Sequence, residues 1–336
     1  MGAADLRTIF LKTDNDIKGI YLADLTKMIM QEMEAEKYCF AELRISIYGK
    51  SMQEWHKLAE WFKFHKIFSH QIRWMIQIPR LYSVYKKNNI IKNFQEMIDN
   101  IFRPIFEVTV DPSVDPELYA LLFQIVGFDT VDDESVYEVL HLKHLALSPS
   151  QWNEDENPIY AYWIYYIYAN LYSLNSLRAM RGLNTFSFRP HCGESGNVDH
   201  LATGFLVADG INHGIRLDHN PVLQYLYYLE QIGIAVSPLS NNKLFLQYQR
   251  NPFPKFFSRG LNVSLSTDDP LMIHITKEPL LEEYAVATQV WNFSTVDLCE
   301  IARNSVRQSS FEEILKKHWI GQNYDSKELD ANGRKD

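Results

Sequence analysis

The sequence alternates short β-type runs with helical patterns, and this alternation constrains the fold more than any other feature. Seven apolar or alternating runs predict strands at 42–49, 72–79, 121–128, 185–194, 213–217, 234–240 and 263–269. Helical patterns lie between and after them, at 24–37, 51–65, 82–101, 159 to about 180, 198–209, 221–231, 279–289 and 295–306. Strands separated by helices are most simply joined by right-handed crossovers into a parallel sheet. The sequence therefore predicts an α/β protein.

Polar residues collect where the predicted strands end. The clusters are 129–134, 191–194, His213, 237–241 and Asp268 with Asp269. A (β/α) barrel places its active-site loops at the carboxyl ends of its strands, which favours a TIM-type barrel. A doubly wound open sheet is the rival, but no G-x-G-x-x-G or G-x-x-x-x-G-K-[ST] motif supports it.

Composition limits the domain count and the class of partner. The 336 residues are 46% apolar, enough for one large domain, with two domains as the alternative. A net charge of -9 argues against a nucleic-acid-binding surface, because phosphate contacts need clustered Lys and Arg. The uncharged run 158–177 contains many tyrosines together with Asn170 and Asn175, so we expect a buried or interface helix rather than a membrane span.

Cysteine usage indicates the redox environment. Cys39, Cys192 and Cys299 are widely spaced, odd in number and form no C-x-x-C motif. This pattern predicts a reduced intracellular protein without a disulfide framework or a cysteine zinc site. Residues 1–16 mix acidic and basic side chains and do not have the pattern of a signal peptide, so we expect a cytosolic protein.

The residues at the strand ends suggest metal-assisted acid–base chemistry. Asp268 can donate a hard oxygen ligand, and Asp269 can bind a water. His191 and Glu194 offer a ligand and a proton carrier in one loop, and His213 can accept a proton near neutral pH. Together they would let a zinc ion activate water. Each element alone is more often structural, since a D-D-P triplet commonly starts a helix.

The combination of these motifs resembles the adenosine/AMP deaminase superfamily, and most specifically the AMP deaminases. It rests on H-C-G-E at 191–194, N-H-G at 212–214, S-P-L-S-N-N at 237–242 and S-L-S-T-D-D-P-L at 264–271. Further matches lie at 11–15, 44–49, 127–134, 221–226 and 276–280, so the resemblance covers roughly residues 4–324. It implies a (β/α)8 barrel portion over 1–324, and the polar, charged composition of 325–336 predicts a disordered tail there.

The resemblance implies a role for each residue of the motifs. His191 and Asp268 would be zinc ligands, and Glu194 would protonate the purine ring nitrogen beside the attacked carbon. His213 would be the base that deprotonates the attacking water. Asp269 would hold that water.

The same resemblance implies the substrate contacts and the reaction. Glu194, Asp269, Pro270, Leu271 and Met272 would bind the purine. The implied reaction is the hydrolysis of AMP to IMP and ammonia, a step of purine nucleotide metabolism and IMP biosynthesis. The cofactor would be Zn²⁺, and the assembly a homotetramer without a membrane span or nucleic acid.

The sequence departs from the family pattern in ways that affect the metal site. The family takes two more zinc ligands from an H-x-H pair on its first barrel strand, and no H-x-H occurs here; His141 and His144 are the nearest approach. We expect barrel strands two to eight to be present, without the first strand or the nucleotide-binding segment after it. Met272 stands where the family usually has glutamine.

These departures leave alternatives open. A catalytic zinc needs at least three protein ligands, so we hypothesise that the chain alone binds zinc poorly and turns over slowly or not at all. A catalytically dead regulatory or assembly subunit, or a fragment, is the non-enzymatic alternative. Within the enzyme class, adenosine is the alternative substrate.

Overall fold

The computed structural model describes residues 3–138 and 146–324. The predicted polar tail lies outside these residues, and so do His141 and His144. The chain divides into two compact units, Met1–Phe188 and Arg189–Asp336, and each is described by itself. The single domain expected over 1–324 stays a prediction.

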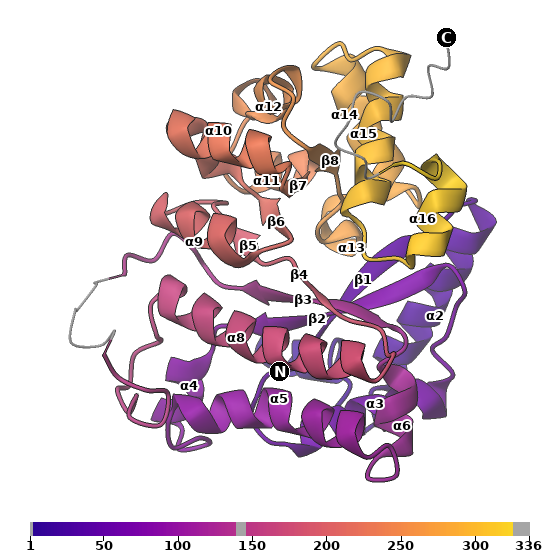
Figure 1. The fold of residues 1–336 in the computed structure, drawn as a ribbon. Coiled ribbons are helices and arrows are strands. Elements are labelled where there is room, and N and C mark those ends of the chain that lie inside the picture. Colours follow the sequence, from indigo (N-terminus) through magenta and orange to yellow (C-terminus); the bar gives the residue numbers. More distant parts are fainter. Residues whose placement is uncertain (1–2, 139–145, 325–336) are drawn as a thin grey trace. The chain divides into compact units, whose positions relative to one another are not determined.

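The first unit is built on a four-stranded parallel sheet with the order β1-β2-β3-β4 (Figure 1). β3 is buried along most of its length and β2 along much of it, as expected when helices cover both faces of a parallel sheet. The strands are β1 (Ala41–Ser46), β2 (Ile72–Pro79), β3 (Ile125–Val131) and β4 (Ser187–Phe188). The helices are α1 (Ala3–Phe10), α2 (Ile20–Ala35), α3 (Gln53–His65), α4 (Tyr82–Lys87), α5 (Phe94–Val110), α6 (Pro116–Leu121) and α8 (Tyr160–Met180).

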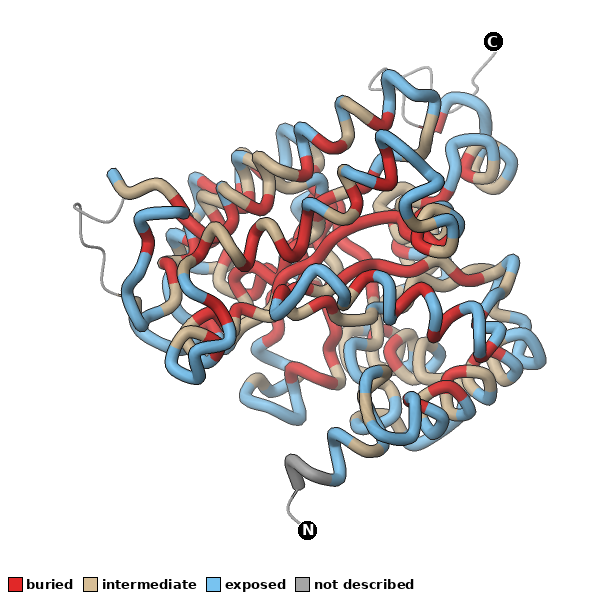
Figure 2. Tube along the Cα trace, turned by 90° about the horizontal axis from the view of Figure 1, so that it is seen from below, coloured by how far each residue is buried: buried red, intermediate tan, exposed pale blue. Residues whose placement is uncertain are grey.

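The second unit has its own four-stranded parallel sheet, in the order β5-β6-β7-β8. Its strands are β5 (His191–Cys192), β6 (Gly210–His213), β7 (Gly233–Val236) and β8 (Val263–Leu265). Its helices are α9 (Asp199–Val207), α10 (Pro221–Glu230), α11 (Pro238–Leu244), α12 (Phe253–Ser258), α13 (Pro270–Ile273), α14 (Pro279–Gln289), α15 (Thr295–Gln308) and α16 (Glu313–Ile320), with short 3-10 helices η1 (Ile215–His219) and η2 (Tyr248–Arg250). α15 packs against β7 and β8. In Figure 2 the buried positions, in red, form continuous runs along some extended stretches of the tube and alternate with exposed positions along the helices.

The predicted α/β class with parallel sheets is confirmed, but two strands are displaced from their predicted positions. The strand predicted at 121–128 is β3, which starts at Ile125, because α6 extends to Leu121 after an N-cap in which Asp115 accepts from the backbone N–H of Leu118 (2.9 Å). The strand predicted at 213–217 is β6, which ends at His213. The φ of His213 is 71°, outside the strand region, and the following residues form η1.

Two other predicted elements are divided. The helix predicted at 82–101 is two helices, α4 and α5, because Asn89 has a left-handed φ of 56° and Asn93 caps α5 by accepting from the N–H of Glu96 (3.0 Å). The strand predicted at 185–194 is two short strands, β4 and β5, separated by Arg189 and Pro190. Proline has no N–H to donate to a ladder, which interrupts the pairing there.

The aromatic segment predicted as a buried or interface helix is α8. Trp163, Ile164, Ile167 and Leu174 are fully buried on it. In the part of the chain that the structure describes, no helix is long and apolar enough to cross a membrane.

The core of the first unit is organised around Phe128 in β3. Its ring is fully buried and packs on the rings of Phe102, Phe186 and Trp55 at centroid distances of 6.0, 5.5 and 6.3 Å. Offset and edge-to-face aromatic contacts of this kind add to the burial of apolar area. These side chains come from β3, α5, α3 and the segment before β4, so one ring joins the sheet to its helices.

Replacing Phe128 by alanine should lower the free energy of unfolding by about 3–5 kcal/mol, since it leaves a cavity in a closed aromatic core. Urea denaturation followed by tryptophan fluorescence measures this. The matched control is Phe64→Ala, because Phe64 is 70% exposed and its loss should change the stability little. Equal losses for the two variants would contradict this description of the core.

Candidate active site

The sheet of the second unit brings three predicted site residues to one edge. His191 begins β5, His213 ends β6, and Asp268 follows β8. The register pairs His191 with Asn212 and Cys192 with His213, which holds the two histidines on neighbouring strands. Because parallel strands end at the same edge, residues 22 to 77 positions apart in the sequence can meet there.

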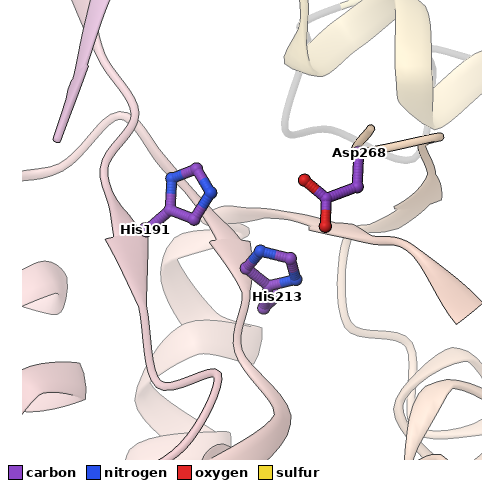
Figure 3. A group of neighbouring side chains, drawn as sticks. All are labelled: His191, His213 and Asp268. Carbon is purple, nitrogen blue, oxygen red and sulfur yellow. The ribbon is translucent and has the colours of Figure 1, made fainter. Parts of the chain in front are cut away.

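His191, His213 and Asp268 form a compact cluster (Figure 3). One ligand atom from each lies within 4.8 Å of the other two. The two imidazole rings are 5.0 Å apart between centroids and inclined by 56°. Both histidines are buried, whereas Asp268 is exposed, so the cluster is closed on the side of the histidines and open on the side of Asp268.

Two of these three residues have a strained backbone. His213 has φ 71° and Asp268 has φ 54°, in the left-handed region that non-glycine residues seldom adopt. Gly214 follows His213 with φ 61°, and a Cβ there would lie 2.9 Å from Cγ2 of Ile234. Strain of this kind persists where the surrounding structure fixes it, and it occurs often at functional sites.

The remaining predicted site residues lie in the same loops. Oε1 of Glu194 is 3.7 Å from Nδ1 of His213, and the Glu194 side chain is partly exposed. Asp269 is exposed, and its carbonyl accepts from the N–H groups of Met272 and Ile273 at the start of α13. Leu271 is 60% exposed and Met272 71%, on the same short helix as Pro270. The catalytic and substrate-binding roles of these residues stay predictions.

The cluster has the donor set of a zinc site. Two imidazole nitrogens and one carboxylate oxygen are ligands that zinc takes in catalytic sites. Around a tetrahedral zinc such atoms would be about 3.4 Å apart. The three ligand atoms lie within 4.8 Å of one another, which is somewhat wider. Modest side-chain rotations would bring them to the spacing of zinc ligands. The imidazole of His213, predicted as a base, belongs to the same group of donors.

The chain is similar in sequence and in fold to known proteins. The family model of AMP deaminase matches residues 1–335. The chain is 57% identical over 331 residues to a protein of Oryza sativa subsp. japonica named "Probable AMP deaminase", covering 98% of this chain and 40% of that protein. It is 54% identical over 333 residues to the AMP deaminase of Saccharomyces cerevisiae, covering 99% of this chain and 41% of that protein. The chain belongs to the AMP deaminase family.

This membership confirms the resemblance found in the sequence. The chain spans about two fifths of the length of the AMP deaminases that it matches, 40% and 41% in these two cases. Its fold is similar to that of an amidohydrolase from Burkholderia ambifaria described with bound Zn, with a TM-score of 0.56, 15% identity, and coverage of 88% of this chain and 71% of that one. The likeness and the parallel sheets agree with part of a TIM-type barrel.

The S-P-L-S-N-N motif of the AMP deaminase pattern contacts the predicted metal ligand directly. Oγ of Ser240 donates to Oδ2 of Asp268 at 2.6 Å. Ser237 and Ser266 share a hydrogen bond of 2.7 Å between their hydroxyl groups, at the ends of β7 and β8. Hydrogen bonds that orient a ligating carboxylate are a common feature of metal sites.

A buried acid–imidazole pair beside the site was not predicted from the sequence. Glu283 on α14 has no exposed side-chain surface, and its Oε1 lies 2.9 Å from Nε2 of His274, whose side chain is also fully buried. Oε2 of Glu283 accepts from the N–H of Leu239 at 3.1 Å. The sequence signal that could have identified Glu283 was its position on the helix. Glu283 and Ala287, one turn apart, form the buried face of α14.

Burial favours the neutral form of both members of this pair. It raises the pKa of Glu283 to about 8, and the nearby charges of Asp268 and Glu282 act in the same direction. Burial also lowers the pKa of His274. Near neutral pH we therefore assign the shared proton to the Glu283 carboxyl, which donates it to a neutral His274 imidazole.

The raised pKa of Glu283 should make stability fall as the pH rises from 6.5 to 8. The folded chain keeps a proton that the unfolded chain, with an ordinary pKa of 4.5, has lost, so deprotonation favours unfolding up to about pH 8. The opposite contribution of His274, whose pKa is lowered from 6.5, is complete above pH 6.5.

Urea denaturation at pH 6.5 and pH 8 compares the wild type with Glu283→Gln. The variant should lose most of the difference in unfolding free energy between the two pH values. A variant that keeps the wild-type difference would show that another group titrates in this window.

Proposed function

We propose that this chain supplies the acid, the base and part of the metal site for hydrolytic deamination of AMP to IMP and ammonia. One observation carries the proposal: His191, His213 and Asp268 converge at the strand ends of a chain that belongs to the AMP deaminase family. The likeness to an amidohydrolase with bound Zn supports a zinc ion as the cofactor.

The predicted residues divide the chemistry among them. His191 and Asp268 would hold the zinc, which when bound would supply an activated water at neutral pH. The imidazole of His213 accepts the proton of the water that attacks the amino-bearing ring carbon. Glu194, 3.7 Å from that imidazole, donates a proton to the adjacent ring nitrogen. His213 then returns its proton to the amino group, the carbon–nitrogen bond breaks, and ammonia leaves. The hydroxyl group left on the carbon gives its proton to the Glu194 carboxylate and becomes the carbonyl group of IMP.

The exposed start of α13 forms the substrate side of the proposed site. Asp269 orients the attacking water and the purine, and Pro270, Leu271 and Met272 line the place of the ring. The side chains of Leu271 and Met272 are exposed, so a bound purine ring would cover part of their surface. Methionine cannot donate a hydrogen bond as glutamine does, so one substrate contact would be apolar here.

The donor set of this chain also bears on its activity in isolation. No H-x-H pair occurs in the sequence, and the described cluster contains three donors, one of which is needed as a base. We therefore propose that the isolated chain binds zinc weakly and turns over slowly or not at all. The homotetramer, the cytosolic location and the preference for AMP over adenosine are parts of the same proposal.

A chimera tests this function. Residues 1–324 replace the matching segment of the Saccharomyces cerevisiae AMP deaminase, to which the chain is 54% identical. The chimera should deaminate AMP much faster than adenosine, while the isolated chain does so slowly or not at all. Glu194→Gln in the chimera should lower kcat by at least about 100-fold, because general acid catalysis contributes about 10²–10⁴-fold.

The matched control in the chimera is Glu230→Gln, since Glu230 is an exposed carboxylate at the end of α10. It should leave kcat unchanged. A folded, zinc-loaded chimera that does not deaminate AMP, or that prefers adenosine, would contradict the proposed function. Equal activity of Glu194→Gln and the parent chimera would contradict the role of Glu194.

A further inference from the structure

The buried carboxyl group of Glu283 joins two segments that follow neighbouring strands at the site. One segment, 237–244, follows β7 and includes α11. The other, 266–274, follows β8 and includes Asp268 and α13. Glu283 reaches the first at the N–H of Leu239 (3.1 Å) and the second at Nε2 of His274 (2.9 Å).

Three further contacts link the same two segments. At their start Ser237 and Ser266 share a hydrogen bond of 2.7 Å. Further along, Ser240 donates to Asp268 (2.6 Å), and Nζ of Lys243 donates to the carbonyl of Met272 (2.8 Å). Unlike the residues of these three contacts, Glu283 lies outside the two segments, on α14, and its side chain is fully buried.

The contact with Leu239 provides an acceptor for a backbone N–H group at the start of α11. This helix begins with Pro238, which has no N–H, and its N-cap residue Ser237 makes no side-chain cap. The N–H of Leu239 is among the first groups of the helix, which have no partner within it. Glu283 therefore performs from α14 the capping role that a side chain at the N-cap usually performs.

The orientation of Asp268 depends on this arrangement. Asp268 is exposed and has a left-handed backbone, so burial does not hold its carboxylate. Ser240, in the first turn of α11, holds it by a hydrogen bond. If the first turn of α11 moves, the hydroxyl group that orients Asp268 moves with it.

We propose that Glu283 is a positioning residue that fixes the carboxylate of Asp268 toward His191 and His213 by bridging α11 and His274. The metal-binding part of this inference rests on the proposed function, because Asp268 is taken there as a zinc ligand. The bridging part rests only on the contacts of Glu283.

Two kinds of variant separate hydrogen bonding from packing. Glu283→Gln keeps a carbonyl oxygen for Leu239 and an N–H donor for His274, so it reproduces a protonated carboxyl group. Glu283→Ala removes both contacts, and Glu283→Asp shortens the reach, so it serves if the alanine variant does not fold. Glu300→Ala is the matched control, because Glu300 is an exposed residue on α15 in the same unit.

The first measurement is amide hydrogen exchange of the metal-free 336-residue chain. In Glu283→Ala and Glu283→Asp, exchange should increase by at least about tenfold in both 238–244 and 266–274, and stay unchanged in α15. Glu283→Gln and Glu300→Ala should resemble the wild type. Wild-type exchange in Glu283→Ala, a uniform increase over the whole unit, or equal increases in Glu283→Gln and Glu283→Ala would overturn the inference.

The second measurement is Zn²⁺ affinity, from competition with a chromophoric chelator. Glu283→Ala should weaken it by about 10–100-fold, as expected for groups that orient a metal ligand, and Glu283→Gln should stay within about threefold of the wild type. Combined with Ser240→Ala, the loss should be less than additive, because both changes release the same carboxylate. Additive losses would overturn the inference.

A His191→Ala variant distinguishes failure of this inference from failure of the proposed function. Zinc binding that does not change in His191→Ala would show that the proposed metal site is wrong. In that case the exchange experiment still decides whether Glu283 bridges the two segments.

Discussion

The parallel pairing of β5 to β8 is the constraint on which the candidate site depends. In a parallel sheet the strands end at one edge, so loops from distant parts of the chain meet there. The pairing of His191 with Asn212 and of Cys192 with His213 sets the two imidazoles side by side. The pairing of β7 with β8 in turn places Oγ of Ser240 2.6 Å from Oδ2 of Asp268.

The left-handed residues show how the strand ends become a site. A strand directs alternate side chains to opposite faces of the sheet. If β6 continued as a regular strand beyond His213, its backbone would stay in the sheet instead of turning at the edge. The positive φ of His213 stops the strand and turns the backbone, and Gly214 follows because a side chain there would collide with Ile234. The same left-handed conformation occurs at Asp268, directly before Asp269, the N-cap residue of α13.

The sequence predicted the periodic elements well and the interruptions poorly. The strand at 72–79 and the helix at 279–289 have their predicted bounds, because each has a clear apolar period. The breaks at Asn89 and at His213 depend on single left-handed residues, which a periodic pattern does not show. The motif residues that cluster at the strand ends could be selected from the sequence, because their residue types carry the chemistry. Glu283 could not, since its importance comes from contacts across three segments.

Anomalous diffraction at the zinc absorption edge tests the central claim most directly. Crystals of the 336-residue chain grown with zinc should show a peak about 2.0–2.2 Å from a ring nitrogen of His191 and from a carboxylate oxygen of Asp268, with His213 as a third ligand or adjoining a bound water. Crystals of Asp268→Ala, grown in the same way, should lose the peak. A peak elsewhere in the chain, or one that persists at this place in Asp268→Ala, would contradict the account.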